Sequence, residues 1–97
     1  MKIELARPHA LGLDDLRARI GARVDHYAAR YPALDLPAHH RWVSDREVRG
    51  SYRGGDGVLR IEPAEVRLTL DLPFFARPFR ARIEEFLKRE ADLMLGA

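Results

Sequence analysis

The sequence predicts a single α+β domain over residues 1–97, in which a twisted antiparallel sheet carries two helices on one face. Apolar residues recur with helical period in one stretch before residue 32 and in another after residue 78. Between these stretches, apolar and polar residues alternate as they do in strands that are covered on one face only. Turn residues separate the strands at short intervals, which favours antiparallel neighbours. The order strand, helix, four strands, helix is typical of a helix-grip arrangement.

Length and composition restrict the class of protein. A chain of 97 residues is too short for a second independent core. Its 46% hydrophobic and 33% charged residues are typical of a soluble globular protein. No apolar run reaches the roughly 20 residues that span a bilayer. Residues 1–7 lack the apolar core of a secretory signal, and without cysteine no disulfide can form. We therefore expect a cytoplasmic protein.

The first half of the chain predicts a strand, a helix and a loop. Ile3 and Leu5 alternate with Lys2 and Glu4, which predicts a short strand that ends before Pro8. Asp14 and Asp15 lie in the first turn of the predicted helix, where acidic residues are favourable. Pro32 ends this helix, and residues 32–38 are predicted to form a loop. The apolar face of the helix consists of Leu13, Leu16, Ile20, Val24, Tyr27 and Tyr31.

The middle of the chain predicts four strands. Residues 40–43 and 47–53 alternate around a turn at residues 44–46, as in a hairpin. Gly54-Gly55-Asp56-Gly57 predicts the next turn, because glycine reaches positive φ angles at little steric cost. Residues 59–62 and 66–72 form two further alternations, and Pro63-Ala64-Glu65 reverses the chain between them.

The closing segment combines aromatic residues with a second helix. Pro73 ends the last strand, and Pro78 suits the first turn of a helix. For Phe74 and Phe75 we favour packing, with one ring between the sheet and the helix. The alternative is that a ring points outward, to a hydrophobic surface such as polyester or to a partner protein. The apolar stripe of the helix consists of Phe79, Ile83, Phe86, Leu87 and Met94.

The charge pattern argues against a nucleic-acid partner. The formal net charge is only +2, and arginine supplies 15 of the 17 basic residues. Glu47, Glu62 and Asp71 can balance the arginines of the strands, and Tyr52 is the one obvious aromatic residue near them for base stacking. We therefore expect a solvated, charge-balanced outer face of the sheet. The strand arginines are Arg41, Arg49, Arg53, Arg60 and Arg67.

No residue pattern indicates catalysis, a metal or a cofactor. The four histidines match no spacing of metal ligands. Cysteine is absent, and Ser44 and Ser51 lie in no context typical of a catalytic nucleophile. His9 lies beside the start of the first helix, where we expect a hydrogen bond from it to fix the turn. We therefore predict a protein that is not an enzyme and that holds neither metal nor cofactor.

Short motifs spread over nearly the whole chain resemble a known family. They are His9-Ala10-Leu11-Gly12 before the first helix, Trp42 near the start of the middle strands, Val66-Arg67-Leu68 in the last strand, and Ile83-Glu84 with Leu87 in the closing helix. In order and spacing they resemble the polyhydroxyalkanoic acid system protein family. Its members are encoded near genes for storage-polyester synthesis and granule proteins. No catalytic residues are established for the family.

The resemblance implies a non-enzymatic accessory or regulatory protein of polyhydroxyalkanoate metabolism. Such a protein would bind at the polyester granule or to granule proteins, and so be granule-associated in the cytoplasm. The alternative is a small module that binds a hydrophobic acyl ligand in a pocket between the sheet and the closing helix. A core filled by Phe75, Phe79, Ile83 and Phe86 would contradict that pocket.

Glu90 interrupts the apolar stripe of the closing helix between Phe86 and Met94. Either the helix has passed the edge of the sheet there, so that the carboxylate reaches water or an arginine, or Glu90 lines a pocket. A buried carboxylate would need a charged partner such as an arginine. The candidate contact residues for a surface or a pocket are therefore Phe74, Phe75, Glu90 and Trp42.

Overall fold

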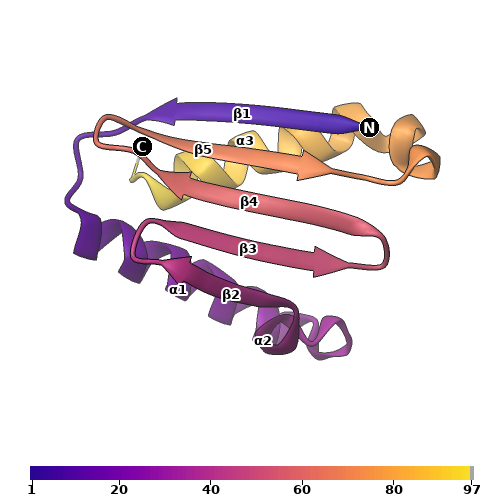
Figure 1. Ribbon diagram of the computed structural model, residues 1–97, viewed down its shortest axis with the longest axis horizontal. Helices are drawn as coiled ribbons and strands as arrows, with labels where there is room; N and C mark the ends of the chain where they lie inside the picture. Colours follow the sequence, from indigo (N-terminus) through magenta and orange to yellow (C-terminus); the bar gives the residue numbers. More distant parts are fainter. Residues whose placement is uncertain (97) are drawn as a thin grey trace.

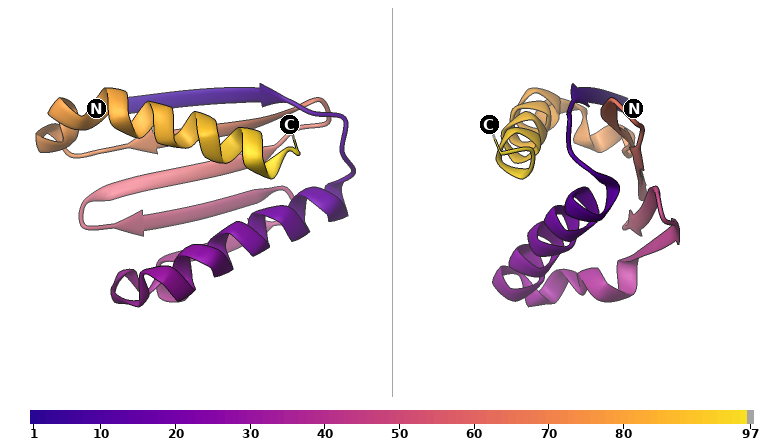
Figure 2. Two further views of the ribbon diagram at one scale, coloured as in Figure 1. Left: turned by 180° about the vertical axis from the view of Figure 1, so that it is seen from behind. Right: turned by 90° about the vertical axis from the view of Figure 1, so that its left-hand side faces the viewer.

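A five-stranded antiparallel sheet forms one layer of the protein, and two long helices lie together on one of its faces (Figures 1 and 2). The computed structural model describes residues 1–96. The long helices are α1 (Leu13–Arg30) and α3 (Arg80–Met94). The predicted α+β class, with two helices on one face of an antiparallel sheet, is confirmed. The strands are β1 (Lys2–Pro8), β2 (His40–Ser44), β3 (Glu47–Tyr52), β4 (Gly55–Ile61) and β5 (Glu65–Asp71), in the spatial order β1-β5-β4-β3-β2.

The first strand pairs with the last. β1 runs antiparallel to β5, from Lys2 opposite Asp71 to Pro8 opposite Glu65. The backbone of Met1 continues this pairing, because its carbonyl accepts from the N–H of Leu72 at 2.8 Å. β1 and β2 are therefore the two edges of the sheet. Prediction ended the first strand before Pro8, but Pro8 belongs to it, because an edge strand can accommodate a residue without an N–H.

The buried core lies at one end of the molecule. Leu16 and Ile20 of α1 pack against Ile61 of β4 and Val66 of β5, and all of these are buried. The view from behind shows why this cluster lies here, because α1 and α3 converge where α1 begins and α3 ends (Figure 2). Toward the other end the helices diverge, and the inner face of the sheet is covered less completely.

The loop predicted for residues 32–38 is wrong. The structure has a 3₁₀ turn, η1 (Pro32–Leu34), followed by a short helix, α2 (Leu36–His39). Asp35 separates them with a φ of 48°. Each short element has a proline at its first or second position, where the fixed φ of proline favours helical backbone. Residues 32–39 show no helical periodicity of apolar residues, so these short elements could not be predicted from the sequence.

The glycine-rich turn lies earlier than predicted. Arg53 and Gly54 occupy the turn with φ of 48° and 83°, and Gly55 already begins β4. Two consecutive positive φ angles match the twist of a two-residue hairpin. Gly57 serves packing instead, because a Cβ there would lie 2.9 Å from Cδ2 of Leu70.

The closing helix begins later than predicted. Residues Phe74–Phe79 form a 3₁₀ segment, η2, and α3 begins at Arg80. Pro78 lies inside η2 and disfavours α-helical backbone at Arg77, so the regular helix starts only after the proline. η2 consequently carries the two adjacent phenylalanines out of the sheet before α3 returns over its inner face (Figure 1).

His9 ties the crossover from β1 to α1 onto the turn between β4 and β5, which confirms its predicted structural role. Its Nδ1 accepts from the N–H of Leu11 at 3.1 Å, so the ring proton is on Nε2, which donates to the carbonyl of Glu62 at 2.8 Å.

We expect His9→Ala to lower the free energy of unfolding by about 1–3 kcal/mol, because both hydrogen bonds are lost. Urea denaturation measures this effect. His26→Ala, on the exposed side of α1, is the control, and an equal loss in both variants would contradict the role.

Candidate functional site

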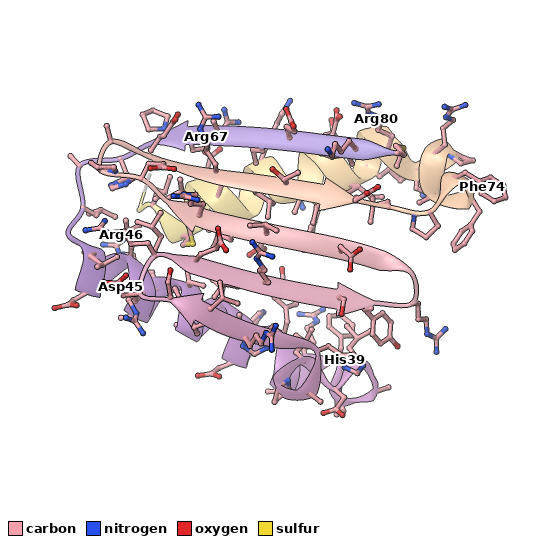
Figure 3. The ribbon with its side chains drawn as sticks, viewed as in Figure 1. His39, Asp45, Arg46, Arg67, Phe74 and Arg80 are labelled. Atoms are coloured by element: carbon pink, nitrogen blue, oxygen red, sulfur yellow. The ribbon has the colours of Figure 1, made fainter. Side chains whose placement is uncertain are left out.

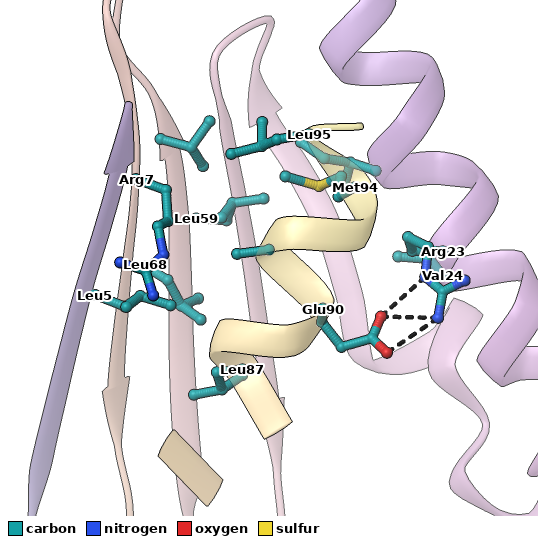
Figure 4. A pocket seen from close by; sticks show the side chains of 13 residues that line it. Leu5, Arg7, Arg23, Val24, Leu59, Leu68, Leu87, Glu90, Met94 and Leu95 are labelled. Atoms are coloured by element: carbon teal, nitrogen blue, oxygen red, sulfur yellow. Dashed lines mark hydrogen bonds and ion pairs between the residues drawn. The ribbon is translucent and has the colours of Figure 1, made fainter. Parts of the chain in front are cut away.

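A cavity of about 200 Å³ lies between the sheet and the two helices (Figure 4). Its walls are mostly apolar, because the inner side chains of β1, β4 and β5 meet the stripe of α3 there. Arg7, Arg23 and Glu90 are the charged residues that line it. Apolar residues of the lining include Leu5, Leu59, Leu68, Leu87, Met94 and Leu95.

An open groove continues from this cavity along the inner face of the sheet. The groove has a volume of about 440 Å³ and shares Leu59 and Leu68 with the cavity. Gly50, Gly55 and Gly57 lie along it, so parts of its floor carry no side chains. We call the cavity and the groove together the inner trough. Other apolar residues of the groove are Leu36, Val48, Tyr52, Leu70 and Leu72.

Glu90 joins the two helices across the inner trough. Nε of Arg23 donates to Oε2 of Glu90 at 2.9 Å, and Nη2 donates to Oε1 at 3.0 Å, in a bidentate pair. The hydroxyl of Tyr27 also donates to Oε1, at 2.5 Å. Arg23 and Tyr27 are four residues apart on α1, so both side chains face α3. We call this set of contacts the helix bridge. Glu90 therefore lines a cavity and reaches an arginine there. The expectation that the helix has passed the edge of the sheet is wrong, because Met94 and Leu95 line the same cavity.

Burial and charge set the protonation of the helix bridge. Burial, and next the hydrogen bond to Glu90, raise the pKa of the Tyr27 phenol. The hydrogen bond to Glu90 also raises the pKa of Arg23. The phenol consequently remains a neutral donor and the guanidinium remains a cation near neutral pH. Since the carboxylate accepts from both partners, it is better suited to hold the helices than to abstract a proton.

The packing prediction for the adjacent phenylalanines is wrong. Phe74 is 84% exposed, Phe75 65% and Phe79 54%. Figure 3 shows the reason, because Phe74 projects from the end of the molecule, beyond the sheet. The rings of Phe74 and Phe75 contact each other edge to face, with centroids 6.1 Å apart. We call Phe74, Phe75 and Phe79 the phenylalanine patch.

The aromatic core that would have contradicted a pocket is not formed. Phe86 is 44% exposed and lies edge to face against Tyr27, with ring centroids 5.8 Å apart. Phe75 and Phe79 are exposed as well, so these phenylalanine rings do not fill the space between α3 and the sheet. Leucine side chains and the cavity occupy that space.

Trp42 does not line the cavity, so of the two roles considered for it, at a surface or in a pocket, the pocket role is wrong. It packs against the buried core, and the guanidinium carbon of Arg17 lies 4.8 Å from the centroid of its ring. Its strand, β2, is the edge of the sheet farthest from β1, which explains why it does not reach the cavity.

The sequence analysis did not identify Arg7, Arg23 and Tyr27 as residues of the site. The signal for Arg7 was the alternation of β1, and the signal for the other two was their spacing on α1.

The outer face of the sheet carries paired charges, as expected from the sequence. Arg67 pairs with Glu65 at 2.7 Å, and Arg60 pairs with Glu62 at 2.9 Å. Glu47 pairs with Arg49 at 2.9 Å.

Within residues 1–96, no three His, Asp or Glu side chains lie close enough together to bind a metal ion. No helix in this range is long and apolar enough to cross a membrane.

The raised pKa of Tyr27 predicts a loss of stability in alkali. The unfolded phenol ionises near a pKa of about 10, whereas the folded phenol ionises later. This contribution to stability is therefore complete below pH about 10 and is lost as the pH rises through the folded pKa. We expect Tyr27→Phe to lack this alkaline loss and to remove a late-titrating tyrosine from the tyrosinate absorbance. Tyr31→Phe, at an exposed position, is the control, and identical titrations of the two variants would contradict the prediction.

The helix bridge predicts an energetic coupling between α1 and α3. In a double-mutant cycle of Arg23→Leu and Glu90→Leu, we expect the coupling to exceed that between Arg80 and Glu84, an exposed pair within α3. The reason is that the Arg23–Glu90 pair is bidentate and partly buried, whereas exposed pairs contribute little. Chemical denaturation of the variants measures both couplings. A Glu90→Leu single variant more stable than the wild type would contradict a stabilising bridge.

Comparison with known families places the chain. A family model described as "Putative polyhydroxyalkanoic acid system protein" matches residues 3–95, which include both long helices and all five strands except Lys2 of β1. No curated protein and no solved structure matches the chain. The matched range agrees with the resemblance seen in the short motifs from His9 to Leu87. The chain belongs to the polyhydroxyalkanoic acid system protein family.

Proposed function

We propose that the protein is a non-enzymatic accessory or regulatory protein of polyhydroxyalkanoate metabolism that binds at the storage-polyester granule, in the cytoplasm, through the phenylalanine patch. The exposure of this patch carries the proposal, since Phe74 alone is 84% exposed. Contiguous exposed apolar side chains mark interaction sites in soluble proteins. Family membership supplies the pathway, and the patch supplies a surface that suits a hydrophobic polymer or a granule protein.

The backbone of η2 favours such binding. Pro73 and Pro78 flank or interrupt the segment and fix φ at these positions, so little backbone freedom is lost when the patch binds. Each ring that leaves water contributes about 1.5–3 kcal/mol. Arg77 lies in the same segment as the rings and is exposed, and its guanidinium can donate to ester carbonyl or anionic groups at the same surface.

A non-enzymatic role is consistent with the polar groups of the inner trough. Glu90, the carboxylate of the cavity, accepts hydrogen bonds from Arg23 and Tyr27. Ser44 accepts from the backbone N–H of Arg46 within a turn. These side chains have structural partners in the fold, which supports accessory binding over a catalytic role.

Granule sedimentation tests the proposal. In polymer-producing cells we expect the wild-type protein to sediment with the granules and Phe74→Ser to do so much less. With purified granules the Kd should rise about tenfold or more, the effect of one buried ring. Val43→Ser is the matched control, because Val43 is also an exposed apolar residue but lies on the edge strand β2.

The same assay separates a polymer surface from a granule protein. Protein-free polyester particles should bind the wild type as well as native granules do if the patch contacts the polymer. Binding to native granules alone would assign the contact to a granule protein. The proposal is wrong if neither wild type nor Phe74→Ser sediments with granules, or if both sediment equally.

A further inference from the structure

Arg7 places a cation in the wall of the cavity. The alternation of β1 turns Ile3, Leu5 and Arg7 to the inner face, and Arg7 lies opposite Val66 of β5. Figure 4 shows its side chain extending from β1 toward Leu68, between the sheet and α3. A guanidinium in this position has exchanged water for leucine side chains over part of its surface.

The hydrogen-bonding capacity of Arg7 is incompletely used. Its Nε is buried and makes no hydrogen bond within residues 1–96. Arg7 forms a long ion pair with Asp92, in which Oδ1 lies 3.8 Å from Nε, beyond hydrogen-bond distance, and the Asp92 side chain is 60% exposed. Arg23 differs, because Glu90 accepts from both arms of its fork. A buried donor without an acceptor is unfavourable, and the Arg7 side chain is still 34% exposed, so a ligand can reach the guanidinium beside the buried Nε.

We propose that the inner trough binds a medium-chain alkyl carboxylate, with its carboxylate on the guanidinium of Arg7 and its chain along Leu68 and Leu59. A planar guanidinium matches a carboxylate in bidentate geometry. The apolar walls match an alkyl chain. The alkyl chain of the ligand passes beside the helix bridge into the open groove. This site lies apart from the phenylalanine patch and does not depend on granule binding.

The dimensions of the inner trough determine how long an alkyl chain the ligand can have. An engineered cavity of about 150 Å³ holds benzene, so a cavity of about 200 Å³ has room for about eight non-hydrogen atoms. That is the size of a six-carbon acid. Longer chains extend into the open groove, since Leu59 and Leu68 line both spaces. Acids of about six to ten carbons should therefore bind better than acetate or butyrate, which leave the leucines uncovered.

Calorimetry with octanoate and octanol tests the role of Arg7, since these ligands share an alkyl chain and differ in the carboxylate. We expect the wild type to bind octanoate at least tenfold more tightly than octanol. Arg7→Met should lose this preference and retain the affinity for octanol. Arg60→Met is the matched control, because Arg60 is an exposed, ion-paired arginine on the outer face, and it should keep the preference.

Amide chemical shifts keep the test decisive if Arg7→Met folds poorly. Octanoate should shift the amides of Leu5, Leu59 and Leu68 in the wild type, and Arg7→Lys, which keeps the charge without the fork, should weaken these shifts. Phe74→Ser should leave them unchanged, so failure of granule binding and failure of this site are distinguishable. Equal affinity for octanoate and octanol, an equal loss in Arg60→Met, or no octanoate-dependent shifts in the trough would each overturn the proposal.

Discussion

The pairing of β1 with β5 is the contact on which the arrangement of the molecule depends. β1 leads into α1 and β5 leads through η2 into α3, so this pairing starts the two long helices from neighbouring strands. Because the strands are antiparallel, the helices begin at opposite ends of the sheet. Both then return over the same face, converge at one end and enclose the buried core there (Figure 2).

A polar contact, and not only an apolar seam, joins these helices. The first half of α1 buries Leu16 and Ile20, but Arg23 and Tyr27 follow on the same face and meet Glu90 of α3. Charge pairs have directional geometry, so the bridge holds the helices at a defined spacing without filling the space below them. The helix bridge thus joins α3 to α1 above the open trough, together with the hydrogen bond from Arg19 to the carbonyl of Met94 at 2.9 Å.

Periodicity predicted the elements of the fold but not their ends or surroundings. The alternations of β1 and β5 and the apolar stripe of α1 were sufficient to place strands and helix, because each pattern continues over several residues. The stripe of α3 was also correct as a pattern, yet Phe79 and Phe86 on it are exposed. A helical stripe shows which residues share a side, and it contains no information on where the sheet beneath it ends.

The site residues were predictable to a different degree. Glu90 was recognisable because it breaks an apolar stripe, but its partners come from another helix and depend on tertiary structure. Arg7 was missed because the alternation recognised in the first strand covered only residues 2–5, whereas β1 continues to Pro8 and turns Arg7 inward. Trp42 was misplaced because a large aromatic residue suits a core as well as a pocket.

The two proposed sites lie at opposite ends of α3 and are linked by the inner trough. α3 has 15 residues and is therefore about 22 Å long, with the phenylalanine patch before its first turn and Asp92, the neighbour of Arg7, in its last. The open groove reaches Leu72 and Gly55, and Cγ of Pro73 lies 3.7 Å from the Cβ position of Gly54. The groove therefore opens at the end of the molecule that carries the patch. A surface held by the patch would face this opening, and an alkyl carboxylate entering there would meet leucines first and the guanidinium of Arg7 last.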